Sequence, residues 1–474
     1  MLPPLIQRPR RSASRRSRER GVTIALVAVA LVSIIAMAGL SIDIGTLYEA
    51  SAEAQRAADA GALAAARIIS MSGVTGDPVN HFLHWQQVCG GPSSPASSAA
   101  TVVAQQSTVG GIPLPAGGVI VKYGVDSGGP TALDCSTLTV GFGVNALVTV
   151  TVLQSNLPAY FSRIWGRTGS SAGATATAEV FNPSNSGTYT SSGDLMPVQP
   201  RCVKPWIVPN VDPSNPPNGF VSLADGSILN PGIQQVDGGV IGKEFSIGPA
   251  CKQGAPSCQG LLNLLTNPPK WIAPPNPPGP PPALILEYVP ALVGTSTAVP
   301  SCGAANPYQQ AIAGCDQTAV YACGTLNGAQ ADLTETPANP TVVSGDTSTA
   351  AQCLINQSAG RDILDPTTFP FQIQVQSGSP LIKAGVIAGD IVTSSNSIVT
   401  LPIFDGRNPL GAGPTPQITI VGFLQVFINK VDPNGNLDVT ILNVAGCGNG
   451  LTTLVGSPAL NGTSPVPIRL ITPP

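Results

Sequence analysis

Residues 22–42 read VTIALVAVALVSIIAMAGLSI, a run of 21 residues without a charged side chain. As an α-helix this run is roughly 30 Å long, which matches the hydrocarbon thickness of a lipid bilayer. A helix also pairs its backbone polar groups within itself, as any segment inside lipid must. We therefore expect a single transmembrane helix over residues 22–42, with Val22 and Ile42 bounding the membrane anchor.

Basic residues crowd in front of the apolar run. Residues 1–21 hold seven of the 22 basic residues but only one of the 25 acidic residues. Basic flanks resist transfer across a membrane, so this tail is expected to stay in the cytoplasm and the bulk of the chain to lie on the other side. The arginines nearest the run set this topology: Arg15, Arg16, Arg18 and Arg20.

The helical pattern continues beyond Ile42. Residues 43–70 (DIGTLYEASAEAQRAADAGALAAARIIS) are rich in alanine and contain no proline, which favours an uninterrupted helix. Small side chains recur on one face at helical spacing, and such a face lets two helices approach closely. We expect this face to pack against a partner helix through Ala57, Ala58, Gly61 and Ala65.

A cleaved secretory signal is the alternative to an anchor. Residues 36–38 (Ala-Met-Ala) offer a small-residue cleavage site. The apolar run is longer than a signal core of 7–15 residues, and the helical pattern continues through the site. We therefore favour an uncleaved anchor, and a mature N-terminus at Gly39 would favour the signal.

The exported part is acidic and poor in charge. It holds 15 basic and 24 acidic residues, a net charge of −9, and the whole chain is only 10% charged. Such a surface offers no basic stripe to phosphates, so no nucleic-acid partner is expected. The 52 glycines and 48 prolines favour strands, turns and loops.

All ten cysteines lie beyond the apolar run, in an expected oxidising compartment. An even number there predicts disulfide bonds, whose connectivity the sequence leaves open. The chain has no Cys-x-x-Cys pair and only two histidines, so we expect neither a metal nor a cofactor. The disulfide candidates are Cys89, Cys135, Cys202, Cys251, Cys258, Cys302, Cys315, Cys323, Cys353 and Cys447.

An Asp-x-Gly-x-x-Tyr pattern follows the apolar run and leads into an alanine-rich stretch. The pattern comprises Asp43, Gly45, Tyr48, Gln55, Ala57, Ala58, Asp59, Ala60, Ala62, Leu63, Ala64 and Ala65. It resembles the N-terminal module of TadG-like proteins (TadE/TadG-like family) of the bacterial Tad, or Flp, pilus-assembly system. The resemblance implies a non-enzymatic, single-pass inner-membrane protein that faces the cell envelope and whose partners are other pilus-assembly proteins.

The chain departs from the pattern of pilin subunits. Type IV pilins carry Glu five residues after the Gly at their processing site, whereas Gly21 is followed at that distance by Leu26. This departure favours an anchored accessory protein or scaffold over a filament subunit.

Residues 71–474 predict a β-rich, disulfide-containing ectodomain, so the fold class is α+β. We expect a small α+β domain over 71–182, a loop- and Pro-rich region with a polyproline spacer over 183–283, a Cys-rich irregular region over 284–369 and a β-rich region over 370–474. The strongest hairpin signal is the Asn-Gly turn within 432–436, between apolar runs.

Two other function classes stay open. An anchored binding module for glycan or peptide is the first, because residues 377–392 (SGSPLIKAGVIAGDIV) resemble part of a PDZ domain. A secreted hydrolase is the second, but the Gly-x-Ser-x-Gly match at 169–173 follows a short helix and precedes a strand, the reverse of a nucleophile elbow. We assign no catalytic residue. We interpret residues 346–350 (DTSTA) as a polar loop and 432–438 (DPNGNLD) as a turn that binds no calcium.

Overall fold

The computed structural model describes residues 16–471, with gaps of which the longest are 75–81, 182–187, 190–194, 250–284, 295–305, 333–344, 407–413, 448–458 and 461–467. The expected polyproline spacer lies outside the described residues. The chain divides into two compact units. The first unit contains residues 1–58, 104–119 and 151–174, and the second contains the remainder. A long N-terminal helix followed by β-rich sheets confirms the α+β class.

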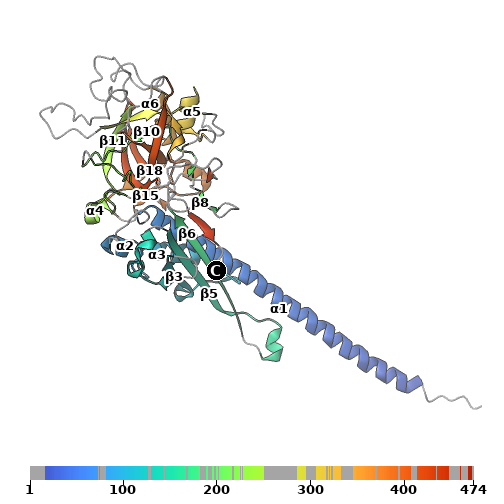
Figure 1. Cartoon of the computed structure of the whole chain (residues 1–474). Helices are drawn as coiled ribbons and strands as arrows, with labels where there is room; N and C mark the ends of the chain where they lie inside the picture. Colours follow the sequence, from blue (N-terminus) through green and yellow to red (C-terminus); the bar gives the residue numbers. More distant parts are fainter. Residues whose placement is uncertain are drawn as a thin grey trace, which may run out of the picture. The chain divides into compact units, whose positions relative to one another are not determined.

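Helix α1 (Arg16–Ser70) is a single helix of 55 residues. It begins six residues before the expected span, so the last arginines of the tail belong to it. Figure 1 shows α1 as one long, unbroken helix. The first unit also contains the hairpin β1 (Thr108–Val109) and β2 (Ile112–Pro113), the short helix η1 (Ala116–Gly118) and the 3-10 helix η4 (Ser162–Trp165).

A five-stranded sheet has the order β21-β6-β5-β3-β4. Its long strands β5 (Asn145–Leu157) and β6 (Ser170–Phe181) have residues in both units, and η4 lies in the connection between them. The edge strand β21 (Ile468–Ile471) comes from the end of the chain, and Arg469 Nε lies 2.7 Å from Glu179 Oε2 on β6. The other strands of this sheet are β3 (Val119–Gly124) and β4 (Thr131–Ala132). The same stretch of the second unit contains the helices α2 (Phe82–Cys89), α3 (Pro95–Gln105), η2 (Cys135–Thr137) and η3 (Val140–Gly143).

The largest sheet closes on itself. Its strand pairings run β18–β17–β10–β12–β11–β19 and return from β19 to β18, and β13 joins the edge of β18. The strands are β10 (Trp206–Pro209), β11 (Glu244–Pro249), β12 (Ile285–Pro290), β13 (Gly324–Gln330), β17 (Ile398–Phe404), β18 (Gln417–Val431) and β19 (Leu437–Gly446). The ring thus joins three regions that the sequence suggests as separate: 183–283, 284–369 and 370–474.

A dense apolar core fills this part of the second unit. Trp206, Tyr288 and Leu424 are fully buried within it, and the helices α5 (Pro307–Ala313) and α6 (Gly345–Leu354) contribute Ile312 and Ala350. Residues 346–350 are therefore helical, and the expectation of a polar loop there is wrong. Asp346 accepts hydrogen bonds from Asn306 and Gln309, so its carboxylate joins α6 to α5.

The end of α1 belongs to the second unit, where the buried Asn443 of β19 donates a hydrogen bond to the carbonyl of Ser70. The smaller elements are β7 (Thr188–Tyr189), β8 (Leu195–Met196), β9 (Gln199–Pro200), α4 (Gln234–Asp237), β14 (Ile363–Asp365), β15 (Gln372–Gln374), η6 (Pro380–Ala384), β16 (Ile391–Val392) and β20 (Ala459–Leu460).

Candidate functional site

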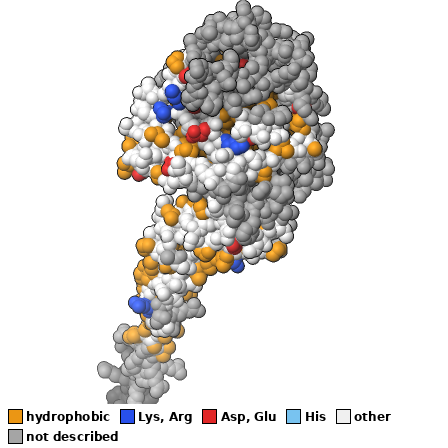
Figure 2. All heavy atoms as spheres, turned by 90° about the vertical axis from the view of Figure 1, so that its left-hand side faces the viewer, with side chains coloured by type: hydrophobic (Ala, Val, Ile, Leu, Met, Phe, Trp, Pro, Cys, Tyr) orange, Lys and Arg blue, Asp and Glu red, His pale blue; other side chains and the backbone are white. Residues whose placement is uncertain are grey.

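The apolar part of α1 is exposed over most of its length. Ile24 is 71% exposed, Ile34 66% and Met37 70%, although these side chains would ordinarily be buried in a soluble protein. Figure 2 shows hydrophobic side chains gathered along this helix. By length and composition, α1 is long and apolar enough to cross a membrane. Lipid is the environment that such an all-round apolar surface fits.

Asp43 is the first charged residue after this surface, and it binds a distant loop. Its carboxylate accepts N–H hydrogen bonds from Tyr160 at 3.1 Å, Phe161 at 3.1 and 3.2 Å, and Ser162 at 2.7 Å. Ser162 is the first residue of η4 and Phe161 is its N-cap, so the carboxylate lies at the start of this short helix, where unpaired donors attract an anion. We call this arrangement the Asp43 clasp.

The clasp also shifts the acidity of Asp43. Loss of solvent opposes ionisation, but the hydrogen bonds from Ser162, Phe161 and Tyr160 outweigh it, and the pKa of Asp43 is lowered. The carboxylate is therefore ionised at neutral pH. An ionised acceptor makes the stronger kind of hydrogen bond to backbone N–H groups.

Phe161 extends the contact from the clasp into the apolar run. Gly39 is buried, and a Cβ built on it would lie 2.8 Å from Cγ of Phe161. The ring therefore lies directly on the helix backbone at Gly39, four residues before Asp43. Only glycine leaves room for it there.

A second clasp lies further along α1. Glu53 Oε2 accepts a hydrogen bond of 2.6 Å from the N–H of Gly110, at the turn between β1 and β2. Gly110 and Gly111 have φ angles of +62° and +74°, a conformation that glycine adopts readily. A Cβ on Gly110 would lie 2.6 Å from Leu157 and 3.6 Å from Ala50, so helix, turn and strand are closely packed here.

A pocket of about 250 Å³ lies between the two clasps. Its lining includes three carboxylates, Asp43, Glu49 and Glu53, and no basic side chain. Two of these carboxylates already accept backbone N–H groups. Within the described residues, no group of three His, Cys, Asp or Glu side chains is placed to hold a metal ion.

The small residues expected to meet a partner are covered by the chain itself. Ala57, Ala58 and Ala65 are fully buried, and Gly61 is buried as well. A partner helix would have to displace this packing to reach them. The exposed residues on the same stretch are different ones: Tyr48 is 80% exposed and Ile44 is 58% exposed.

The residues predicted for the anchor and its topology occupy the start of α1. Val22 is 65% exposed and Ile42 is 49% exposed, and their role as the bounds of the anchor stays a prediction. Arg16, Arg18 and Arg20 lie in the first turns of α1, and Arg15 lies outside the described residues. The side on which these arginines lie stays a prediction.

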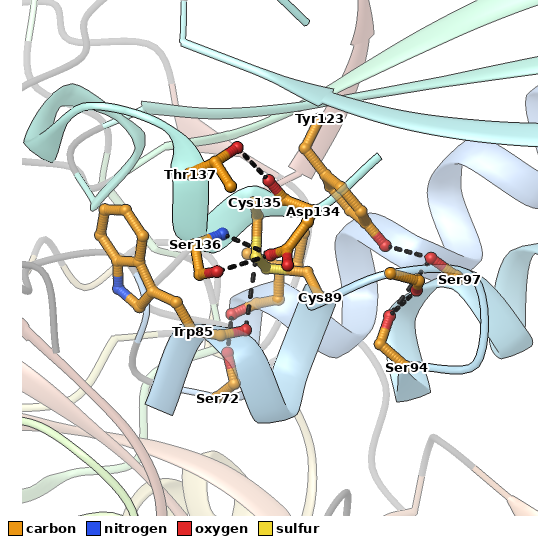
Figure 3. The surroundings of a disulfide bond; sticks show 12 residues. Ser72, Trp85, Cys89, Ser94, Ser97, Tyr123, Asp134, Cys135, Ser136 and Thr137 are labelled. Carbon is orange, nitrogen blue, oxygen red and sulfur yellow. Dashed lines mark hydrogen bonds between the residues drawn. A yellow bond between two sulfur atoms is a disulfide. The ribbon is translucent and has the colours of Figure 1, made fainter. Parts of the chain in front are cut away.

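Disulfide bonds are present, as expected. Cys89 pairs with Cys135 and Cys202 with Cys315, and both Cys353 and Cys447 are disulfide-bonded too. Figure 3 shows the first bond, which links α2 to η2. The remaining candidates lie outside the described residues: Cys251, Cys258, Cys302 and Cys323.

The polar residues around the Cys89–Cys135 bond make hydrogen bonds with one another. Asp134 caps η2 by accepting hydrogen bonds from the N–H and hydroxyl of Ser136, at 2.9 and 2.6 Å (Figure 3). The hydroxyl of Tyr123 lies 2.7 Å from that of Ser97. The bond thus links α2 to η2 across a sequence separation of 46 residues.

Three further sequence motifs resemble calcium, catalytic or peptide-binding sites: residues 432–438, 169–173 and 377–392. Asp432 accepts hydrogen bonds from the backbone and side chain of Asn436, so its carboxylate closes the turn. The Gly-x-Ser-x-Gly match runs into β6 and is not followed by a helix. The PDZ-like stretch contributes only the two-residue edge strand β16 to the sheet β14-β15-β16.

Comparison with known proteins singles out the segment that holds Gly39, Asp43 and Glu53. Residues 21–67 match the putative Flp pilus-assembly TadE/G-like family. The match confirms the resemblance drawn from the Asp-x-Gly-x-x-Tyr pattern. It covers the apolar run and the helix beyond it, and leaves the rest of the chain unassigned. Comparisons with curated proteins and with solved structures give no match.

The sequence did not reveal the clasp. Asp43 is part of the TadE/G-like pattern, and residues 158–165 are recognisable from the sequence as a short helix. No feature of the sequence indicates that these two segments, 117 residues apart, bind each other. The one available signal was the position of Asp43, a lone carboxylate at the end of an apolar helix.

Proposed function

We propose that the protein is a membrane-anchored scaffold of Tad pilus assembly without enzymatic activity. The observation that carries this proposal is the coincidence of the TadE/G-like match with an exposed apolar helix. In this proposal the arginine-rich end faces the cytoplasm, and the disulfide-bonded part lies beyond the inner membrane, where disulfides persist.

The exposed face of α1 just outside the expected span is the proposed partner contact. Ile44 and Tyr48 are one helical turn apart, and a side chain on Gly45 would meet nothing within 4 Å. An aromatic and an aliphatic side chain beside a glycine offer apolar area and space for close approach. We prefer this face as the partner contact to Ala57, Ala58, Gly61 and Ala65, because those four residues are already buried within the chain.

Site-specific photo-crosslinking in the source bacterium tests this contact. A photoreactive residue at Tyr48 should capture another protein of the pilus-assembly system or a second copy of this chain. The matched control places the same residue at Thr46, which lines the pocket. Capture at neither position, in cells that make pili, would count against a scaffold role for this face.

Genomic neighbourhood separates this function from an anchored binding module. Genes for a secretion ATPase and a Flp-like pilin beside this gene would support pilus assembly. A glycan- or peptide-binding module predicts other neighbours, and the two-residue strand β16 offers little edge for peptide pairing.

A further inference from the structure

The chain from Leu157 to Phe161 runs along α1 from its polar part toward its apolar run. Leu157, at the end of β5, lies near Gly110, which is also close to Ala50 of α1. Four residues later, Phe161 lies against Gly39. Between these two levels α1 advances by roughly 16 Å, at 1.5 Å per residue. The connection from β5 to η4 thus runs the length of three helical turns toward the membrane anchor.

The tip of this connection carries exposed apolar side chains. Ile164 is 77% exposed, and Tyr160 is 58% exposed although its backbone N–H is bound by Asp43. The loop sequence, residues 158–166, reads PAYFSRIWG, and Arg163 is exposed within it. Tyrosine, an aliphatic side chain and arginine together are typical of the membrane–water interface.

The contact with Gly39 sets the depth of this loop. Gly39 lies three residues inside the end of the apolar run at Ile42, about 4–5 Å along the helix. The headgroup layer extends roughly 5–7 Å beyond each side of the hydrocarbon core. A loop that touches Gly39 therefore lies at the level of the headgroups and the outer acyl chains wherever residues 22–42 span the bilayer.

We propose that residues 158–166 form a second membrane contact, in which Tyr160 and Ile164 enter the headgroup–acyl boundary beside α1. The inference rests on the proposed anchoring by residues 22–42. The clasp and the Phe161–Gly39 contact fix the loop to the helix, so the helix and loop together hold this unit at a set height and tilt on the membrane. A single helix without the loop would leave the tilt free.

Photo-crosslinking to lipid tests the inference on the full chain in vesicles of phosphatidylethanolamine and phosphatidylglycerol. The photoreactive residue is placed at Ile164, at Ile34 within the apolar run, or at Leu153, which is 53% exposed on β5. All three sites are exposed and in the same unit, so the substitutions should be tolerated. We expect phospholipid adducts at Ile34 and Ile164 and at most a trace at Leu153.

The three positions distinguish an error in the proposed anchor from an error in the proposed loop contact. Lipid adducts at Ile34 with none at Ile164 would overturn the loop contact and leave the anchor standing. Adducts at Ile164 only to protein would overturn it in favour of a protein partner. No lipid adduct at Ile34 would overturn both the anchor and the inference that depends on it.

Discussion

At the scale of the residue, Asp43 connects the TadE/G-like segment to the rest of the first unit. Its carboxylate holds N–H groups of Tyr160, Phe161 and Ser162, which lie 117 to 119 residues further along the chain. Gly39 complements it by leaving room for the ring of Phe161. One residue of the TadE/G-like pattern, Asp43, thus also fixes a loop onto the helix.

Replacing Asp43 by asparagine should loosen this loop. Asparagine keeps the shape but loses the negative charge that the N–H groups favour, so proteolysis within residues 158–166 should become about tenfold faster. Glu49→Gln, in the same pocket, is the matched control and should leave the rate unchanged. Equal rates for Asp43→Asn and the wild type would show that the clasp does not hold the loop.

The same clasp should weaken in acid. The pKa of Asp43 is lower in the folded protein than the ordinary aspartate value of 3.8. The stability that the ionised carboxylate contributes is therefore complete above pH 3.8 and is lost as the pH falls through the lower, folded-state pKa. Protection of the loop from an acid-tolerant protease should therefore fall below about pH 4 in the wild type. In Asp43→Asn this loss should be absent.

Gly39 and Gly45 should respond oppositely to alanine. A Cβ at Gly39 would lie 2.8 Å from Phe161, whereas a Cβ at Gly45 would meet nothing within 4 Å. Gly39→Ala should lower the melting temperature in detergent because the ring must move. Gly45→Ala should raise stability by up to about 1 kcal/mol through helix propensity. A neutral Gly39→Ala would refute the close Phe161 contact.

Lys204 should give the second unit a characteristic pH dependence. Burial lowers its pKa to about 7, although its ammonium group donates to the carbonyls of Ile312 and Gly314, each at 2.6 Å. The unfolded chain then holds a proton that the folded chain releases, so stability should rise with pH above about 7. Urea unfolding at pH 7 and pH 9 should show this rise in the wild type and lose it in Lys204→Met. The exposed Lys430→Met should behave like the wild type.

At the scale of the element, local patterns predicted the elements that depend on residues close in the sequence. The alanine-rich sequence without proline predicted helix α1. The Asn-Gly turn between two apolar runs predicted the hairpin of β18 and β19. Helix α6 was missed because its polar residues, such as Asp346, find their partners on α5. The closed ring and the Asp43 clasp were missed for the same reason: each depends on pairings between distant segments.

The bond between Cys89 and Cys135 should contribute strongly to the stability of its region. It closes a loop with a sequence separation of 46 residues, for which chain entropy predicts roughly 4 kcal/mol. The double variant Cys89→Ser, Cys135→Ser should therefore unfold at markedly lower urea concentration than the wild type under non-reducing conditions. A loss below about 1 kcal/mol would mean that packing around Trp85 and Phe142 suffices.

At the scale of the whole molecule, the single helix α1 contains the proposed membrane anchor and leads into the disulfide-bonded part of the chain. The TadE/G-like match ends at residue 67, close to Ser70, whose carbonyl is bound by Asn443 of the β-ring. The matched segment therefore extends from the first unit into the start of the second, which begins at residue 59. The disulfides in the described part of the chain beyond it fit an oxidising compartment.

Counting Flp pili on cells of the source bacterium tests whether this anchored protein acts in pilus assembly. Deletion of this gene should abolish the pili, and the full chain should restore them. A version in which a cleaved signal peptide replaces residues 1–42 should be exported yet fail to restore them, because the anchor is lost. Normal pili in the deletion strain would contradict a role in their assembly, and full rescue by the anchorless version would contradict the anchored scaffold.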